Sequence, residues 1–403
     1  MPGSTKIRFI VTGLSIIALL ALLNSCREES FSPSQADSFI KFFGSYDLDE
    51  GFDVKSLDDG GYAVAGTTSE GNSGTNIILI RTDKYGNELW EPKQYGGDFN
   101  DHAYSLKVLP DGGFAILGSK GLRSNTRLIS NMYLIRTDSR GDTLWTREYG
   151  GYTRDTGYHL DLTSDGGFIM IGSTEDMSTR VSDILIVKTD SDGEVMWSRT
   201  HGGSGDDVGT YISETDYGYI YTGYTRSYSQ TGQSSSNIFA AKTNPRGIVT
   251  FPVTYEETGN DSGKALIPLP EGGYILLGTT TNPSTNIKNI FLARVEESNL
   301  NPVWSESLGG NINHVAACIK RTPDGNFVIT GTQELSSANH VIFLLKTDSD
   351  GNQLFFETYG GSGRQRAESV DLTHDGGYVI TGSNELGGNS MITLIKTKAG
   401  GEL

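Results

Sequence analysis

A repeated pattern of short apolar runs constrains this chain of 403 residues more than any other feature. One copy, residues 165–203, reads DGGFIMIGSTEDMSTRVSDILIVKTDSDGEVMWSRTHGG. Its apolar runs are rich in β-branched and aromatic residues and are bounded by Asp and Gly clusters, which is typical of β-strands joined by tight turns. About seven such copies follow one another. The sequence therefore predicts an all-β repeat fold.

The spacing of the copies indicates which repeat fold this is. The expected fourth strand of each copy contains an aromatic residue, and successive aromatics stand 51–55 residues apart. They are Trp90, Trp145, Trp197, Phe251, Trp304 and Phe355. This period is typical of β-propeller blades, and large side chains at this position would fill the space between neighbouring blades. We predict a seven-bladed β-propeller with four-stranded antiparallel blades.

The two ends of the repeat region are expected to complete one blade together. The last copy has three strands and stops at Leu403, whereas residues 38–45 match a fourth strand and its glycine turn. Pairing of residues 38–45 with residues 392–396 would close the ring and remove the exposed sheet edges of an open array. The predicted propeller domain spans residues 38–403.

The N-terminal residues have a different composition. Lys6 and Arg8 precede an apolar run of roughly 15 residues that ends at Leu23, shorter than the roughly 20 needed to span a bilayer. Residues 1–25 are therefore predicted to be a signal peptide. The sequence LNSC resembles the lipobox of bacterial lipoproteins, which implies that Cys26 is lipidated. The alternative is an ordinary signal peptide with a chance cysteine.

The residues after Cys26 suggest a location. The stretch from Ser30 to Asp37 contains Pro and scattered Ser and Gln, so residues 26–37 are expected to form a flexible tether. Arg27-Glu28-Glu29 resembles the surface-export signal of Bacteroidetes-type lipoproteins. The resemblance implies an outer-membrane lipoprotein on the cell surface, with a periplasm-facing anchor as the alternative.

Charge and motifs narrow the function classes. The formal net charge of −17 argues against a nucleic-acid partner, which would need a basic surface. We find no nucleophile elbow, phosphate loop or zinc-ligand spacing, and therefore predict no catalytic residue, no cofactor and no metal site. Two turns, at residues 190–193 and 348–351, have a D-x-D-G pattern that would suit calcium, but Asp and Gly are also what a tight hairpin requires.

Two resemblances concern the repeat itself. The string KTDSDGEVMW at residues 188–197 resembles the repeat of PQQ-type quinoprotein propellers. The preceding DGG motif resembles the uncharacterised DGG-type propeller repeats of bacterial surface proteins. Both resemblances imply a fold rather than an activity. Quinoprotein dehydrogenases carry a vicinal disulfide, and with Cys318 alone inside the repeats no such pair exists, so PQQ binding is not expected.

Residues that recur in nearly every copy are expected to be structural. This group contains the tryptophans and an acid that precedes the first strand of each copy: Trp90, Trp145, Trp197, Trp304, Asp101, Asp155, Asp207 and Asp261. A base also recurs at the end of each third strand, as in Lys188 and Lys396. We expect these acids and bases to form hydrogen bonds or ion pairs between blades.

Binding is expected where the copies differ. The connections between second and third strands, and between fourth and first strands of successive copies, emerge on one face of a propeller, and here they vary in length and chemistry. Variable loops on a rigid scaffold are where binding usually resides. The candidate binding residues on this face are Tyr224, Arg226, Tyr228, Gln230, His314, Arg364, Gln365 and Arg366. Solvated loop residues are the alternative for each of them.

Three function classes follow. The sequence favours a non-catalytic lipoprotein that uses the variable-loop face to bind a protein partner, as a subunit of an outer-membrane complex. The alternative is a surface glycan-binding protein, because Tyr and Arg side chains in this set could stack on a sugar and bind its hydroxyls or an anionic group. A polysaccharide lyase or glycosidase is the third, less favoured class.

Overall fold

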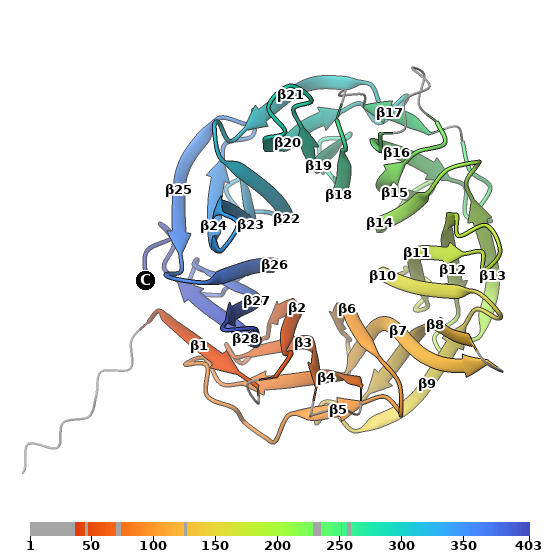
Figure 1. The fold of residues 1–403 in the computed structure, drawn as a ribbon, viewed down its shortest axis with the longest axis horizontal. Helices are drawn as coiled ribbons and strands as arrows, with labels where there is room; N and C mark the ends of the chain where they lie inside the picture. Colours follow the sequence, from red (N-terminus) through yellow and green to blue (C-terminus); the bar gives the residue numbers. More distant parts are fainter. Residues whose placement is uncertain are drawn as a thin grey trace, which may run out of the picture. The chain divides into compact units, whose positions relative to one another are not determined.

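Tight Asp-Gly turns and short β-branched runs fold into four-stranded antiparallel blades that are arranged as a ring (Figure 1). The computed structural model describes residues 37–44, 47–69, 74–124, 127–228, 235–250, 252–255 and 259–403. Within these residues we find no helix that is long and apolar enough to span a membrane. The predicted signal peptide, Cys26 and nearly all of the tether lie outside the described residues, so they stay predictions.

Each blade contains four strands, which succeed one another from the centre of the ring outwards. Blade 1 contains β2 (Glu50–Ser56), β3 (Tyr62–Ser69), β4 (Thr75–Thr82) and β5 (Lys93–Tyr95). Blade 2 contains β6 (His102–Val108), β7 (Phe114–Ser124), β8 (Arg127–Thr137) and β9 (Thr143–Tyr149). Blade 3 contains β10 (Arg154–Leu162), β11 (Phe168–Glu175), β12 (Ser182–Thr189) and β13 (Val195–His201). Blades 4 to 7 contain β14 (Asp207–Thr215), β15 (Gly218–Thr225), β16 (Asn237–Thr243), β17 (Val253–Tyr255); β18 (Ser262–Pro268), β19 (Tyr274–Thr281), β20 (Lys288–Val295), β21 (Pro302–Leu308); β22 (Asn313–Arg321), β23 (Phe327–Ser336), β24 (Asn339–Thr347), β25 (Gln353–Tyr359); β26 (Arg364–Leu372), β27 (Tyr378–Leu386), β28 (Asn389–Thr397), β1 (Phe39–Phe43).

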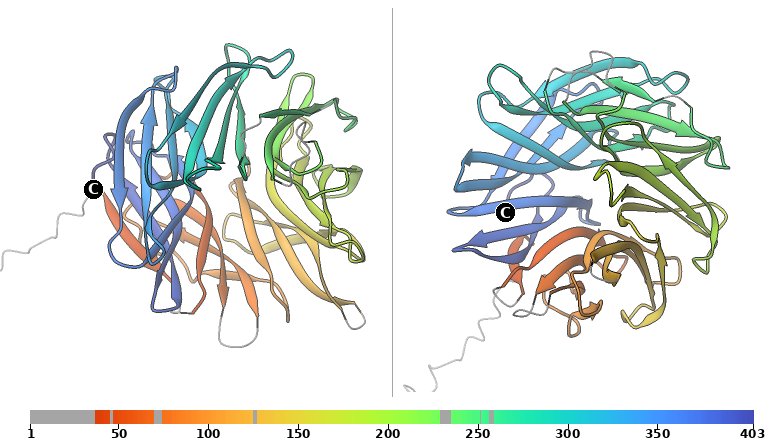
Figure 2. Two further views of the ribbon diagram at one scale, coloured as in Figure 1. Left: turned by 45° about the horizontal axis from the view of Figure 1, so that its top comes forward. Right: turned by 45° about the vertical axis from the view of Figure 1, so that its right-hand side comes forward.

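The first described strand completes the last blade, which confirms the predicted pairing. β1 pairs antiparallel with β28, from Phe39 opposite Lys396 to Phe43 opposite Ile392. In Figure 2 the red strand β1 lies beside the blue strands of blade 7. Blade 1 in turn contacts blade 7, where the backbone N–H of Ser56 donates to Asp371 at 2.9 Å. The chain is a seven-bladed β-propeller.

Neighbouring blades are joined at the outer rim by hydrogen bonds and aromatic packing. The hydroxyl of Tyr149 in β9 donates to the carbonyl oxygen of Gly193 in the next blade at 2.8 Å, and Tyr95 bonds to Gly141 in the same way at 2.6 Å. Trp145 packs edge-on against Phe168 of the next blade, with ring centroids 6.1 Å apart. The rim aromatics therefore occupy the inter-blade space expected from the sequence, although the four tryptophans are only half-buried.

Two outer strands are shorter than the sequence pattern predicts. In blade 1 an isolated bridge joins Thr82 and Glu88, but β5 begins only at Lys93, so Trp90 precedes it. Blade 4 shows the same interruption: an isolated bridge joins Thr243 and Val249, and its outer strand β17 begins only at Val253. Pro92 and Pro252 explain the interruption, because proline has no N–H to donate to the neighbouring strand. Phe251, the expected aromatic of blade 4, lies outside the described residues.

Candidate binding site at the centre of the ring

A β-bulge in the innermost strand shapes the centre of every blade. In β2 the bulge falls between Gly51 and Asp53, and the same shift recurs in all seven inner strands. The extra residue brings its strand close to the second strand, where a Cβ at Gly172 would overlap the carbonyl oxygen of Thr156. The glycine that recurs in every second strand is therefore required by close backbone approach.

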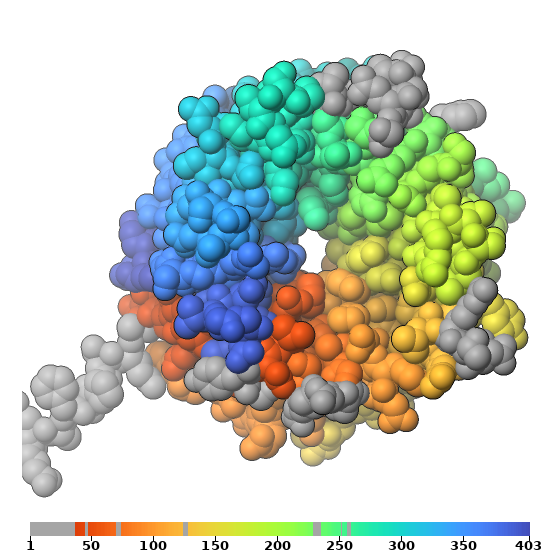
Figure 3. Space-filling model, in the orientation of Figure 1, coloured from red at the N-terminus to blue at the C-terminus, as the bar shows by residue number. Residues whose placement is uncertain are grey.

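The seven bulge residues all line one cavity in the central channel. Its volume is about 510 Å³, within the range of roughly 300–1,000 Å³ that is usual for small-molecule sites. Figure 3 shows the opening at the centre of the ring. In blade order the bulge residues are Phe52, Tyr104, Tyr158, Thr210, Lys264, Ala317 and Glu368.

The bulge layer has an aromatic side and a charged side. Phe52 and Tyr104 pack edge to face with ring centroids 5.2 Å apart, and Tyr104 packs on Tyr158 at the same distance and in the same way. Lys264 and Glu368 come from blades 5 and 7, with the small Ala317 of blade 6 between them. One arc of the channel is therefore apolar, and another presents a cation and a carboxylate.

A second layer of charged residues lies next to the bulge residues, and its ion pairs join neighbouring blades. Lys107 of blade 2 pairs with Asp161 of blade 3 at 2.8 Å, and Lys320 of blade 6 pairs with Asp371 of blade 7 at 3.6 Å. Asp53, which pairs with Lys55, also accepts from the backbone N–H of Leu106 in blade 2 at 2.8 Å. These contacts fix the inner strands against one another.

Burial sets the charge states in this layer. Burial tends to raise the pKa of Asp53, but Lys55, the backbone N–H of Leu106 and Lys320 together outweigh it and hold the pKa below its usual range. Burial lowers the pKa of His159 to about 3, helped by Lys107, so this imidazole is neutral near pH 7. His159 stacks on Tyr211 with ring centroids 4.1 Å apart. Burial also raises the pKa of Glu368, which Lys264 only partly offsets.

The recurring acid at the start of each inner strand caps the connection from the previous blade. Asp101 accepts from the backbone N–H of Gly97 at 2.7 Å and of Gly121 at 2.8 Å. Asp155 and Asp207 accept from Gly151 and Gly203 at 3.2 and 2.9 Å. In blade 5, Asp261 accepts from the backbone N–H of Thr281 at 2.8 Å.

Two of the candidate binding residues occupy this same capping position. Gln365 is buried, accepts from the backbone N–H of Gly361 at 3.4 Å and donates to Ser362 and Asn384. His314 is buried too, with Nδ1 2.9 Å from the carbonyl oxygen of Ile312 and a neighbouring Gln333. Both side chains therefore have partners inside the protein.

The remaining candidates lie in two places. On blade 4, Arg226 pairs with Asp206 at 2.8 Å and the hydroxyl of Tyr228 donates to Gly202 at 3.0 Å. Burial raises the pKa of Tyr224 on the same blade, and Tyr158 of the channel adds to the effect. On blade 7, Arg364 donates to the carbonyl oxygen of Ser337 at 3.0 Å. Arg366 is exposed, and Gln230 lies outside the described residues.

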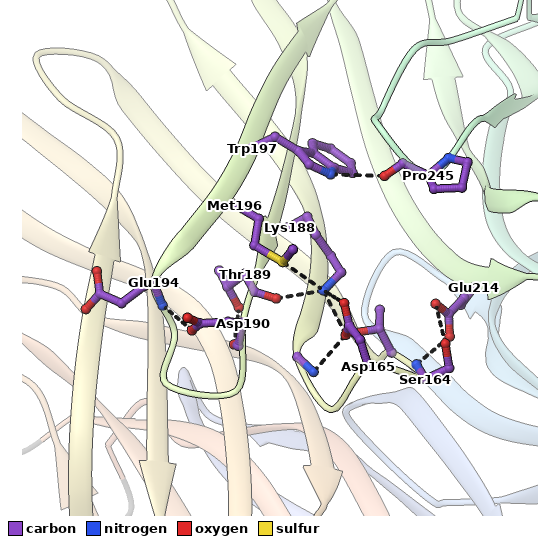
Figure 4. Close-up of polar contacts among 12 residues, drawn as sticks. Ser164, Asp165, Lys188, Thr189, Asp190, Glu194, Met196, Trp197, Glu214 and Pro245 are labelled. Carbon is purple, nitrogen blue, oxygen red and sulfur yellow. Dashed lines mark hydrogen bonds and ion pairs between the residues drawn. The ribbon is translucent and has the colours of Figure 1, made fainter.

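The recurring base ends the third strand, and in blades 1, 2, 3, 6 and 7 it pairs with a turn acid of its own blade. Lys188 donates to Asp165 of the DGG turn at 2.9 Å and to the carbonyl oxygen of Thr189 at 2.7 Å (Figure 4). Burial raises the pKa of Asp165, but hydrogen bonds from Thr163, Lys188 and the turn outweigh it and lower the pKa to about 2. The recurring acids and bases thus lie at opposite ends of the blades rather than against each other.

The D-x-D-G turns are held by their own backbone. Asp190 accepts from the backbone N–H groups of Asp192 and Glu194 at 3.0 and 2.9 Å (Figure 4). Asp348 does the same with Asp350 and Asn352. Among the described residues, no group of three or more His, Cys, Asp or Glu side chains could hold a metal ion.

Comparisons with known proteins find matches among solved structures but not among sequences. No protein-family profile matches the sequence, and a search of curated proteins finds no match. Among solved structures, YCF48 from Cyanidioschyzon merolae is 9% identical, with a TM-score of 0.50 over 89% of this chain and 98% of that one. A puromycin hydrolase mutant complexed with PGG is 11% identical, with a TM-score of 0.51 over 83% of this chain and 50% of the hydrolase chain.

A third structure is described as a β-propeller. The propeller domain of the Trilobed protease from Pyrococcus furiosus is 10% identical, with a TM-score of 0.49 over 89% of this chain and 96% of that one. At 9% and 11% identity, the likeness to the first two structures concerns the fold alone, and the central site has to be interpreted from its own residues.

Proposed function

We propose that this chain is a non-catalytic, lipid-anchored scaffold of the outer membrane that binds a protein partner with its variable-loop face. The anchor is inferred from the lipobox-like sequence before Cys26. The fold supports a binding scaffold, because a closed ring of blades presents rigidly held loops on both faces. The export signal after Cys26 favours the cell surface.

The distribution of exposed apolar side chains carries the proposal. Three leucines stand on the loop face over blades 6, 7 and 1: Leu335, Leu386 and Leu48 are 46%, 65% and 54% exposed. The opposite face presents the acids of the DGG turns, such as Asp111 and Asp375, and also exposes Tyr217 in the corresponding turn of blade 4. Exposed apolar groups that lie together on a soluble surface mark interaction sites.

Backbone hydrogen bonds join the segments that carry these leucines. The backbone N–H of Asp49, next to Leu48, donates to Ser390 in the hairpin that carries Leu386, at 3.2 Å. The hairpin that carries Leu335 bonds through His340 to Gly363 at 3.0 Å. Arg364 lies between the two hairpins, with Glu385 3.5 Å away. Exposed leucines with an arginine between two of the hairpins that carry them are typical of a protein-binding site.

The test is co-purification from detergent-solubilised membranes. We expect the full chain to retain a stoichiometric protein partner, and the double change Leu335→Ser, Leu386→Ser to release it. The matched control is Leu89→Ser, Leu354→Ser, because both of these leucines are 53% exposed but lie on the outer rim. Retention of the partner by the loop-face variant, or loss by the control alone, would contradict the proposal, as would the absence of any stoichiometric partner.

A further inference from the structure

The channel cavity contains polar groups that the fold itself does not use. Within the described part of the chain, neither Lys264 nor Glu368 has a hydrogen bond or an ion pair, although both line the cavity. The acids of the neighbouring layer differ from them, because Asp53, Asp161 and Asp371 each have a lysine partner. A cation and a carboxylate that make neither a hydrogen bond nor an ion pair beside a cavity are groups to which a ligand can bind.

The opposite arc supplies a surface for stacking. Phe52, Tyr104 and Tyr158 come from three successive blades, are half-buried and line the same cavity. Aromatic rings bind the apolar faces of flat or ring-shaped ligands. Tyr104 also lines a second cavity, of about 490 Å³, on the variable-loop face. The aromatic arc is therefore placed between the loop face and the channel.

The charged residues around the cavity indicate whether a ligand there would be charged or neutral. Four lysines line the cavity: Lys55, Lys107, Lys264 and Lys320. Four carboxylates line it or pair with those lysines: Asp53, Asp161, Asp371 and Glu368. Arg321, which also lines the cavity, pairs with Glu271 at 3.2 Å. Because the charges cancel, a ligand with a net charge would leave one charge uncompensated, which is costly in a confined site.

We propose that the central channel binds a neutral sugar, with one pyranose ring stacked on the arc of Phe52, Tyr104 and Tyr158. A hydroxyl group of the sugar donates to the carboxylate of Glu368, and another accepts from the ammonium group of Lys264. Hydroxyl groups suit this pair because each can donate and accept. The site is separate from the leucines of the loop face, and its occupant is a small molecule rather than a protein.

The test is isothermal titration of the full chain in detergent with a panel of neutral methyl glycosides and disaccharides. At least one neutral sugar should bind saturably. Lys264→Met and Glu368→Gln should each weaken that binding about tenfold or more, and Tyr104→Ala should weaken it further. Lys264 and Glu368 make no hydrogen bond or ion pair that these changes would remove, so both variants should fold normally, as circular dichroism can verify.

The matched controls carry the same substitutions outside the channel. Lys84→Met, Glu91→Gln and Tyr217→Ala alter exposed residues and should bind the sugar as the unchanged chain does. Glucuronate and free amino acids serve as the competing ligand classes. Binding of either class as tight as that of the best neutral sugar would overturn the proposal. No saturable sugar binding, or unchanged binding by the Lys264 and Glu368 variants, would overturn it too.

Discussion

The carboxyl group of Glu368 shows how a single residue can be placed for binding at the expense of stability. Burial within the channel raises its pKa above the ordinary value of 4.5, and Glu50 adds to the effect. Water reaches Glu368 through the channel, where its side chain is accessible, so screening keeps the effect modest. Groups placed for function commonly reduce stability in this way.

The pH dependence of this effect has a definite sign. Between the ordinary pKa and the raised one, the folded state binds more protons than the unfolded state, so the free energy of unfolding falls as pH rises through that window. We expect Glu368→Gln to be more stable than the unchanged chain at pH 7, with the difference shrinking as pH falls to 4.5 and below. Urea denaturation at several pH values measures this difference in the free energy of unfolding. Glu91→Gln should show no such difference, and an equal gain at pH 4 and pH 7 would contradict the explanation.

At the scale of one blade, the turn glycines determine how neighbouring blades fit. Gly193 in the turn between β12 and β13 has a φ of +78°, and a Cβ there would lie 2.9 Å from the ring of Trp145 in the previous blade. Gly166 has a similar φ of +82°, but a Cβ there would meet nothing within 4 Å. Substitution of Gly166 therefore adds backbone strain alone, whereas substitution of Gly193 adds backbone strain and also disturbs the packing between blades.

We predict different costs for the two alanine variants. Gly166→Ala should lower the free energy of unfolding by about 1–2 kcal/mol, the usual cost of a left-handed conformation. Gly193→Ala should cost about 1–3 kcal/mol more, because Trp145 must also shift to make room. Chemical denaturation measures both. Equal costs would mean that the rim contact contributes little to the joining of blades.

The blades were predictable from the sequence because their signals are local. Turn residues, β-branched runs and rim aromatics recur in each copy, so the number of blades and the pairing of β1 with β28 followed from counting. The outer strands of blades 1 and 4 are shorter than the repeat pattern predicts, because Pro92 and Pro252 interrupt them. The repeat pattern gives no sign of the central bulge residues, because residues such as Lys264 and Glu368 differ from those at the same position in the other six blades.

At the scale of the whole molecule, the closing strand holds the ring together. Phe43 of β1 is 8% exposed and packs in a core with Val54 and Ile78 of blade 1, whereas its neighbour Phe42 is 46% exposed. Since Phe43 joins blade 7 to blade 1, its loss affects the stability of the closed ring and not of one strand only.

We expect Phe43→Ala to lower the free energy of unfolding by about 3–5 kcal/mol, the usual cost of removing a buried phenylalanine. Phe42→Ala, on the same strand, should cost less than about 1 kcal/mol. Thermal denaturation followed by circular dichroism compares the two. If Phe43→Ala produced a small separate transition and left the main one unchanged, β1 would be an appendage rather than the closure of the ring.

The pairing of β1 with β28 also has a consequence for biosynthesis. Phe39 leaves the ribosome about 350 residues before its partner Lys396, which at roughly 5–20 residues per second is a delay of about 20–70 s. Throughout this delay the nascent polypeptide cannot finish its last sheet, whatever the earlier segments have achieved. Completion of blade 7 therefore has to wait until the β28 segment has been synthesised, long after blades 1 to 6 are available to fold.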